Sequence, residues 1–421
     1  MLTRHLLETL AAALADTPAV LLQGARQVGK STLAEALAGA RPQRAYRTFD
    51  DGSELAAALA SPDGYVRGFS GPVALDEIQR APELFRAIKA SVDRDRTAGR
   101  FLLTGSANVL LLPRLSESLA GRIEILTLWP LSQGEIDGVM ETFVDRAFGE
   151  PRPNWSVSKA RASKAAHARN ASPTLAQRIV RGGFPEPMTR ATAARRASWY
   201  ASYVDTNLRR DIRDLANIDG LREVPKLLAL VASRVSGLLN LADLSRGLAL
   251  PQTSLKRYFT LLEALFLVTT LPAWTTNRGL RLVKAPKVFL TDTGLASHLV
   301  GADAATLEAD GRIRGILLEN FVVVEILKQL GWCKVRPTAH HFRSTSGVEV
   351  DIVLEDRAGR IVGIEVKSCA TVNADDFRGL RMLRETAGKK FVRGIVLHDG
   401  ESTVHFDEQF LSAPISALWS A

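Results

Sequence analysis

The stretch AVLLQGARQVGKSTLAEALAG, residues 19 to 39, carries the clearest fold signal in the sequence. A short apolar run comes first, then Gly24, and five positions later Gly29-Lys30-Ser31. The apolar residues after Ser31 recur at the three- and four-residue spacing of an amphipathic helix. A strand, a Gly-x-x-x-x-Gly-Lys-Ser turn and a helix are together the spacing and context of a phosphate-binding loop. The stretch therefore predicts an α/β fold built on a parallel sheet.

Each residue type in this turn suits the binding of a phosphate chain. Glycines allow the backbone to bend so that its N–H groups face a β-phosphate at a helix N-terminus. Lys30 is expected to place its charge on the β- and γ-phosphate oxygens, and Ser31 to ligate Mg²⁺. ATP and Mg²⁺ are therefore the expected cofactors. The residues expected to bind the nucleotide in this turn are Gly24, Gln27, Val28, Gly29, Lys30, Ser31 and Thr32.

Two acids end a second apolar run, PVALDEIQ at residues 72 to 79. Asp76, at the carboxyl end of a strand beside the loop, is expected to hold Mg²⁺ through its water shell. Glu77 is expected to polarise the attacking water, because in-line attack on a γ-phosphate needs a second carboxylate. The acid pair is a weak signal alone and a strong one together with the loop.

Two further segments supply candidates for contact with a γ-phosphate. The run RFLLTGSAN ends in Thr104, Ser106 and Asn108, where a phosphate sensor is expected; a plain strand-to-helix turn is the alternative. Arg122 follows in LAGR at residues 119 to 122. An arginine there can stabilise transition-state charge in cis or across the subunit boundary of an oligomer. The alternative for Arg122 is an ordinary surface arginine that opens a strand.

The composition limits the classes of protein to which the chain can belong. The 421 residues are 46% hydrophobic and 24% charged, enough to give each of several modules a core. The net charge of +9 favours a polyanionic partner such as DNA or RNA, although an ordinary solvated surface gives the same balance. Cys333 and Cys369 are the only cysteines, which excludes a disulfide scaffold and a zinc cluster and makes the cytoplasm the expected location. No apolar run approaches the length of a membrane span, and the N-terminal stretch is predicted to be a soluble helix rather than a signal peptide.

The chain is predicted to divide into four parts. Residues 1–135, with five short apolar runs between helical patterns, form the P-loop domain. Residues 136–219 form a basic insertion and helical connector, in which positions 151 to 185 hold seven Lys and Arg and no acid. That segment is expected to be an exposed basic insertion or a mere linker. Residues 220–283 form a winged-helix-like domain, and residues 284–421 a C-terminal α/β domain.

The winged-helix prediction depends on residues 240 to 274, which have the order helix, glycine-bearing turn, helix, strand. The second helix is expected to begin after Pro251. The wing is expected at TTNRGLRLVK, residues 275 to 284. Near the start of the second helix stand the residues that would face nucleic acid, namely Gln252, Ser254, Lys256 and Arg257. Such a domain can also pack against protein alone.

A hairpin predicts a second site near the C-terminus, in VEVDIVLEDRAGRIVGIEVKS at residues 348 to 368. A three-residue loop closed by Gly359 in the left-handed conformation sets the register that places Asp351 opposite Glu365. Cross-strand neighbours are close enough for two carboxylates to share one Mg²⁺. Lys367 faces the same way and suits the stabilisation of charge on a phosphate. A register shift of one residue would separate the carboxylates.

The helix predicted at residues 315 to 330 supplies one more carboxylate. Glu319 lies on its apolar stripe, an expensive placement unless a partner awaits it. Glu325 falls on the polar side together with Lys328 and Gln329. A resemblance to restriction-endonuclease-like folds implies that Glu319 joins Asp351 and Glu365 as a metal ligand.

Several motifs in order carry a family resemblance. GARQVGKST, FDD at 49 to 51, ALDEIQRAPELFRAIKASVD, LLTGSAN, LAGR and LWPLSQGEI resemble bacterial AAA-like ATPases of the additional-strand, catalytic-glutamate class. GGFPE at 182 to 186, YVDTNLRRDIRDL, VFLTDTGLA and the EVD and EVK pair look like the domain of unknown function that usually follows that core. The resemblance implies ATP binding through Gly29, Lys30 and Ser31, with Asp76 and Glu77 in the magnesium and water roles. It does not extend to residues 141 to 175.

A second resemblance concerns the C-terminal acids. Glu319, Asp351, Glu365 and Lys367 resemble the E…D…ExK constellation of restriction-endonuclease-like folds. We therefore expect a Mg²⁺-dependent ATPase that couples its nucleotide state to nucleic-acid engagement. In one version the C-terminal domain cleaves DNA or RNA with Mg²⁺. In the other the chain is an ATP-dependent switch that binds nucleic acid or a protein partner, and its nuclease-like domain is catalytically inactive.

Overall fold

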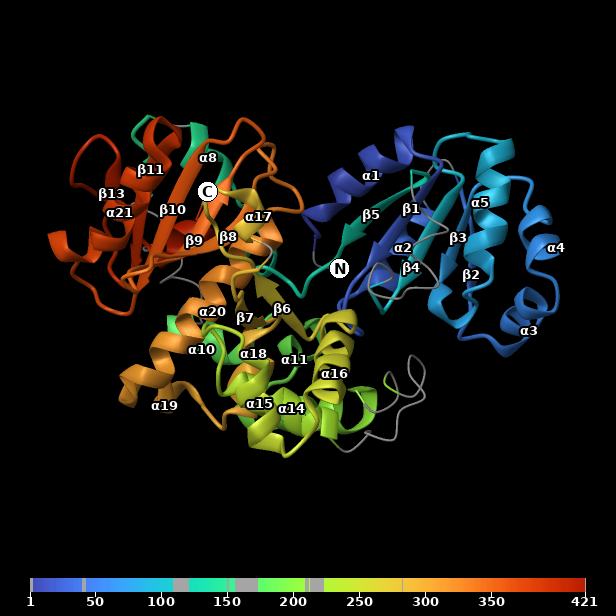
Figure 1. Cartoon of the computed structure of the whole chain (residues 1–421). Helices are drawn as coiled ribbons and strands as arrows, with labels where there is room; N and C mark the ends of the chain where they lie inside the picture. Colours follow the sequence, from blue (N-terminus) through green and yellow to red (C-terminus); the bar gives the residue numbers. More distant parts are fainter. Residues whose placement is uncertain are drawn as a thin grey trace.

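In a computed structural model of the protein, the described residues are 3–39, 43–108, 121–149, 151–155, 173–208, 212, 223–281 and 283–420. Figure 1 shows three units: an α/β unit from the N-terminal part of the chain, an α/β unit from the C-terminal part, and a mainly helical unit below and between them. Within the described ranges no helix combines the length and apolar character needed to cross a membrane.

The N-terminal unit contains the parallel sheet that the sequence predicts. Its strand order is β2-β3-β4-β1-β5, and every neighbouring pair is parallel. The strands are β1 (Ala19–Gln23), β2 (Ala45–Thr48), β3 (Val73–Asp76), β4 (Phe101–Gly105) and β5 (Ile123–Thr127). Strands β1, β3 and β4 are buried along their whole length, which explains why each is a continuous apolar run.

Helices cover both faces of this sheet. They are α1 (Leu6–Asp16), α2 (Lys30–Ala38), α3 (Gly52–Ala60), α4 (Pro62–Arg67) and α5 (Leu84–Arg94). Alternate residues of β1 point to opposite faces, so Leu22 packs in the core that holds α1 and α2 while Leu21 packs in the core that holds α4 and α5. The first of these cores continues through the helical unit to Ile352 and Ile364 on the C-terminal sheet. The three units therefore share one core.

The helical unit begins directly after β5. Its helices are α7 (Gln133–Asp137), α8 (Phe143–Gly149), α10 (Leu175–Arg181), α11 (Pro185–Met188), α12 (Ala193–Ser202), a π-helical segment (Tyr203–Leu208), α14 (Glu223–Ala232), α15 (Leu241–Leu248), α16 (Gln252–Ala264), α17 (Arg278–Arg281), α18 (Thr293–Leu299) and α19 (Ala304–Ala309). One of them leaves the unit: α8 lies beside the C-terminal sheet (Figure 1), where Arg393 donates to the Ala147 carbonyl at 3.0 Å. The chain thus reaches the C-terminal unit early and returns.

Helices α15 and α16 are followed by a two-stranded antiparallel sheet, β6 (Val268–Leu271) and β7 (Lys287–Leu290). Gln252, Lys256 and Arg257 are exposed on α16 and Ser254 is half-buried. The order of elements is the predicted one. Whether the unit is a winged helix stays a prediction.

The predicted wing, residues 275–284, has a different structure. The short helix α17 stands there in place of a strand ribbon. Arg281 forms an ion pair with Glu355 of the C-terminal sheet, and Trp274 Nε1 donates to the same carboxylate at 3.2 Å. The segment is therefore anchored on the C-terminal unit, because a partly buried acid at the end of β9 attracts its arginine.

The basic segment at 151–185 is only partly the exposed insertion that composition predicts. Residues 156–172 lie outside the described residues. In α10, Arg178 is 7% exposed and its Nη2 lies 2.9 Å from Asp137 Oδ2, while Ile179 is fully buried. A count of charges along the segment misses this pairing because Asp137 lies outside it.

The C-terminal unit is a six-stranded mixed sheet of order β12-β13-β11-β10-β9-β8. Its elements are α20 (Gly311–Gln329), β8 (Thr338–Arg343), β9 (Glu349–Glu355), β10 (Ile361–Lys367), α21 (Arg378–Ala387), β11 (Phe391–His398), β12 (Val404–His405) and β13 (Phe410–Pro414). Strands β8, β9 and β10 pair antiparallel, and β10, β11 and β13 pair parallel.

The predicted polar side of α20 is buried, contrary to its pattern. Glu325 is 2% exposed, Lys328 4% and Gln329 0%. This face of α20 meets α7 and the loops around it, which supply polar partners in place of water. Glu325 accepts from the Gln133 N–H at 2.9 Å, and Lys328 Nζ donates to the Leu131 carbonyl at 2.9 Å. Periodicity marks a face as polar but does not tell whether its partner is water or protein.

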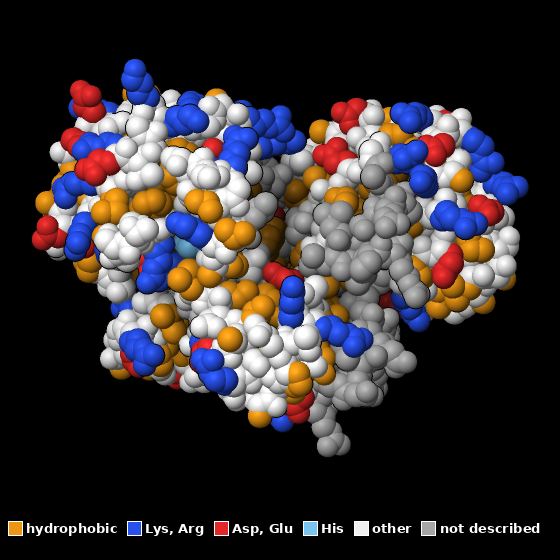
Figure 2. Space-filling view, viewed as in Figure 1, with side chains coloured by type: hydrophobic (Ala, Val, Ile, Leu, Met, Phe, Trp, Pro, Cys, Tyr) orange, Lys and Arg blue, Asp and Glu red, His pale blue; other side chains and the backbone are white. Residues whose placement is uncertain are grey.

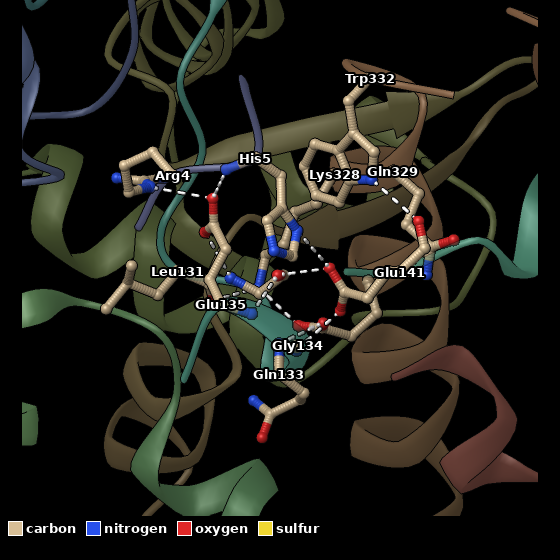
Figure 3. A network of polar contacts seen from close by, with 12 residues as sticks. Arg4, His5, Leu131, Gln133, Gly134, Glu135, Glu141, Lys328, Gln329 and Trp332 are labelled. Carbon is tan, nitrogen blue, oxygen red and sulfur yellow. Dashed lines mark hydrogen bonds and ion pairs between the residues drawn. The ribbon is translucent and has the colours of Figure 1, made fainter. Parts of the chain in front are cut away.

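The same buried network reaches the N-terminus (Figure 3). Glu135 Oε1 accepts from Arg4 Nε at 3.0 Å and from the His5 N–H at 2.7 Å. Glu141 accepts from Ser132 Oγ at 2.6 Å and lies 3.2 Å from His5 Nδ1. Arg4 and His5, just before α1, therefore contribute contacts to both carboxylates.

Glu325 makes stability depend on pH. Burial, opposed by Lys328 and reinforced by Glu141, raises the pKa of Glu325 to about 7 from 4.5. The folded state then holds more protons than the unfolded state between these two values, so the free energy of unfolding falls as pH rises through that window. In Glu325→Gln this fall is expected to be smaller. Urea unfolding at constant ionic strength between pH 4.5 and 7.5 measures it.

Glu308→Gln, which changes an exposed glutamate on α19, is the matched control and keeps the wild-type slope. An unchanged slope in Glu325→Gln would contradict the assignment of this proton to the buried network.

Candidate functional site

The turn after β1 has the backbone of a phosphate cradle. Gly24 has φ 153°, and a Cβ there would stand 2.2 Å from the Leu128 carbonyl oxygen. Gly29 has φ 97° and caps α2, and among the described residues no side-chain hydrogen bond caps that helix. A helix N-terminus that follows a glycine turn is the arrangement that binds an anion.

Lys30 is buried at the base of this turn. Its side chain curls back so that Nζ donates to the Gly24 carbonyl at 2.9 Å and to the Ala25 carbonyl at 2.8 Å. An ammonium held by backbone carbonyls of the loop itself is positioned within the loop and available for a stronger, charged acceptor.

Asp76 lies at the centre of a polar cluster at the carboxyl edge of the sheet. Its Oδ1 accepts from Ser31 Oγ at 3.0 Å and from Thr104 Oγ1. Its Oδ2 accepts from Tyr46 OH at 2.9 Å and from Thr48 Oγ1 at 3.3 Å. The predicted partners Asp76 and Ser31 are together. Tyr46 and Thr48 were not predicted, although both lie on β2, the strand that neighbours β3.

Glu77 follows in the left-handed conformation, with φ 59°. Its N–H donates to Thr104 Oγ1 at 3.1 Å, and its carboxylate accepts from Gln79 Nε2. Gln79 Nε2 also donates to Ser106 Oγ at 2.8 Å, and the Ser106 N–H donates to Gln79 Oε1 at 3.2 Å. The unpredicted Gln79 therefore joins the two predicted residues Glu77 and Ser106. The sequence feature that could have indicated Gln79 is its position two residues after Glu77.

Arg122 does not join this group. It precedes β5, which runs parallel to β1, so it lies at the amino edge of the sheet whereas the phosphate loop follows the carboxyl end of β1. Its Nε lies 2.6 Å from Asp93 Oδ1. The structure thus excludes a γ-phosphate contact by Arg122 within its own chain, and only the contact across a subunit boundary stays a prediction.

A cavity opens beside the phosphate loop. Its lining residues are Arg4, Val28, Gly29, Thr32, Leu33, Leu131 and Pro185. The Leu131 N–H donates to the Gly183 carbonyl at 2.7 Å, which holds the GGFPE motif against this side of the N-terminal unit. Arg4 Nη1 donates to the Val28 carbonyl at 2.7 Å. The cavity therefore combines a mainly apolar wall with one guanidinium.

The C-terminal hairpin has the predicted loop and register. Gly359 has φ 78°, its N–H donates to the Asp356 carbonyl at 2.9 Å, and the Asp356 N–H donates to the Arg360 carbonyl at 3.1 Å. Strand pairs run from Ile361 with Glu355 to Ile364 with Ile352. The next position of this register places Asp351 opposite Glu365.

The predicted metal ligands meet a lysine there. Lys287 Nζ lies 2.8 Å from Glu319 Oε1 and 3.1 Å from Asp351 Oδ1. Glu365 Oε1 lies 3.0 Å from Lys367 Nζ, as the shared strand face predicts, and its buried Oε2 has no hydrogen-bond partner among the described residues. Across the described parts of the chain, no three or more His, Cys, Asp and Glu side chains form a group that could hold a metal ion.

Burial governs the charges of this cluster. Burial raises the pKa of Glu365 to about 8, with the neighbouring Asp351 carboxylate adding to the effect. Burial acts to lower the pKa of Lys287, but the Asp351 and Glu319 carboxylates outweigh it and raise that pKa above the ordinary value. Lys287 is therefore charged at neutral pH. Sequence reasoning missed it because it lies on β7, outside the C-terminal hairpin.

Comparison with known families gives three matches along the chain. Residues 16–137 match the family described as AAA domain, which agrees with the N-terminal sheet and its phosphate loop. Residues 172–306 match a domain of unknown function (DUF8612), and residues 314–418 another (DUF4143). The restriction-endonuclease-like character of the C-terminal unit is not among these matches and stays a prediction.

Two curated relatives match most of the chain. They are Uncharacterized protein Rv2008c of Mycobacterium tuberculosis and Uncharacterized protein Mb2031c of Mycobacterium bovis. Each is 31% identical over 361 residues, which cover 85% of this chain and 72% of the relative. Among solved structures, the Thermotoga maritima RuvB Holliday junction branch migration motor is 20% identical, with 63% of this chain and 89% of that chain covered. Its TM-score of 0.27 is too low to support an argument.

The close approach at Gly24 predicts a large effect of one methyl group. Gly24→Ala is expected to lower the free energy of unfolding by about 2 kcal/mol or more, because the new Cβ meets the Leu128 carbonyl in a strained backbone conformation. Gly52→Ala is the control, since a Cβ there meets nothing within 4 Å and its effect stays within about 0.5 kcal/mol. Chemical denaturation compares the two; equal stabilities would contradict the packing at Gly24.

Proposed function

The chain belongs to the family of these two mycobacterial proteins and carries an AAA domain, and we propose that this domain binds ATP with Mg²⁺ and hydrolyses it. The observation that carries the proposal is the contact of Ser31 with Asp76 at the start of α2. A hydroxyl and a carboxylate from two adjacent elements of the loop edge are the pair that Mg²⁺ uses in phosphate-loop proteins.

The residues present fit the nucleotide and its metal. The backbone of residues 24–30 offers N–H donors to a phosphate chain, and the Lys30 side chain offers a buried ammonium. Ser31 and Asp76 offer oxygens to Mg²⁺. When bound, the metal would neutralise charge on the β- and γ-phosphate oxygens. Tyr46 and Thr48 hold the second oxygen of Asp76, so its first oxygen keeps a fixed direction toward Ser31.

Glu77 is the proposed base that orients the attacking water. Its backbone is fixed by Thr104, and its carboxylate is held by Gln79, which also holds Ser106. A carboxylate tied to a neutral amide is held in place without a competing cation. Ser106 is proposed as the γ-phosphate sensor, because the Gln79 side chain connects it to Glu77.

The cavity beside the loop is the proposed binding place of the adenine base of ATP. Leu131 and Pro185 give it apolar walls, and Arg4 stands at its edge. A flat heterocycle suits such walls, and a guanidinium suits its π-face. Arg4 also binds Glu135 and the Val28 carbonyl. A base bound in the cavity would therefore affect the buried polar network around Glu135.

Two activities are candidates for the part of the chain outside the AAA domain. In the first, Glu319, Asp351, Glu365 and Lys367 cleave nucleic acid with Mg²⁺; the support is the meeting of α20 with the hairpin in the predicted register. In the second, the chain binds nucleic acid or protein through the exposed start of α16 without cleavage, as the ammonium already placed between Glu319 and Asp351 supports. On the face in Figure 2, basic side chains are spread over the surface with acids among them.

Two variants test hydrolysis. Lys30→Ala is expected to weaken ATP binding by about 10- to 100-fold, because a charge-assisted contact to phosphate is worth about 1.5–3 kcal/mol. Glu77→Gln is expected to bind ATP like the parent and to lose about 10²- to 10⁴-fold in rate. Arg86→Ala on α5, an exposed residue outside the loop edge, is the control. Parent-like binding and hydrolysis in Lys30→Ala would refute the proposal.

A second experiment tests nucleic-acid engagement. The ATPase rate and the affinity for double-stranded DNA are measured at two salt concentrations, for the parent and for Lys256→Ala/Arg257→Ala. We expect DNA to stimulate the rate, the affinity to fall with salt, and the variant to bind more weakly with a smaller salt slope. Absent or salt-insensitive binding by the parent would rule out the nucleic-acid form and leave a protein partner.

A further inference from the structure

Lys287 is fixed at the junction of three elements. Its backbone pairs with Leu271 of β6 on one side and bridges Leu238 on the other. Its side chain crosses to the C-terminal unit, where α20 supplies Glu319 and β9 supplies Asp351. The side chain is 4% exposed. A lysine held by backbone pairing at one end and by ion pairs at the other is a part of the fold, in contrast to a mobile surface group.

The carboxylates around it do not fit a divalent ion. Mg²⁺ requires a near-octahedral shell of oxygens at about 2.0–2.1 Å. The ammonium of Lys287 lies within hydrogen-bond distance of both Glu319 and Asp351 and fills the space between their oxygens. The other oxygen of Asp351 accepts from the Val366 N–H at 2.9 Å. Both oxygens of this acid are therefore engaged by the chain.

The neighbouring acids also have basic partners. Glu349 Oε1 lies 2.8 Å from Arg343 Nη1, and its Oε2 lies 3.5 Å from Lys287 Nζ. Glu365 Oε1 lies 3.0 Å from Lys367 Nζ. Each of these acids therefore has a basic side chain of the protein close by.

We propose that the Lys287 ammonium is the resident cation of the cluster of Glu319, Asp351 and Glu349, in the position that a divalent ion would take in an E…D…ExK site. The cluster then joins the helical unit to the C-terminal sheet, and the C-terminal unit acts without metal-dependent cleavage of phosphodiesters. This deepens the binding form of the proposed function for the C-terminal unit and is independent of ATP hydrolysis.

Metal binding to the nucleotide-free full chain tests the proposal. Mn²⁺ is titrated by calorimetry into the parent, Asp351→Asn, Lys287→Met and the double variant Lys287→Met/Asp351→Asn. Met keeps the length of the lysine stem and removes its charge. We expect the parent and Asp351→Asn to bind the same number of Mn²⁺ ions. Lys287→Met is expected to bind one more, and the double variant to lose it.

Two results would overturn the proposal. One is a parent that binds one Mn²⁺ more than Asp351→Asn; the other is a folded Lys287→Met that gains no site. If circular dichroism shows that Lys287→Met does not fold, the comparison of the parent with Asp351→Asn decides alone. The phosphate loop is the same in all four proteins, so metal bound there cancels, and a failed ATPase assay leaves this outcome unaffected.

Discussion

The buried polar junction between α7 and α20 is the constraint that fixes how the units are arranged. Glu135, Glu141 and Glu325 are each at most 3% exposed, and their partners come from the residues just before α1, from α7 and its flanking loops, and from α20. Leaving one buried carboxylate without its partner costs several kcal/mol, more than most surface contacts supply. The N-terminal and C-terminal units are therefore held in one relative position by electrostatics as well as by the shared core.

Helix α20 connects this junction to the carboxylates of the C-terminal unit. Its carboxyl-terminal half carries Glu325 and Lys328, which contact α7 and the loop before it. Its middle carries Glu319, which faces Lys287. A helix is stiff over this distance. At the other side of the junction, Arg4 contacts the phosphate loop through Val28. One continuous set of contacts thus runs from the loop to the C-terminal carboxylates.

The features that sequence predicted are local ones. The phosphate loop and the strand that precedes it follow from glycine spacing and burial, and the hairpin register follows from the single left-handed residue Gly359. Several features it missed have partners that are distant in the sequence. Gln133 and Glu325 are 192 positions apart, and Lys287 and Asp351 are 64 apart. Periodicity assigned Glu325 to a polar face correctly, but it could not show that the face meets protein.

Hydrogen–deuterium exchange with and without a non-hydrolysable ATP analogue tests the coupling of the nucleotide to the rest of the chain most directly. If the contacts of Arg4 carry the nucleotide state, binding slows exchange in the phosphate loop and also changes it in α7 and α20, and Arg4→Ala loses the second effect while it keeps the first. Changes confined to the phosphate loop and its neighbouring strand ends, with α7 and α20 unaffected in the parent, would contradict the account.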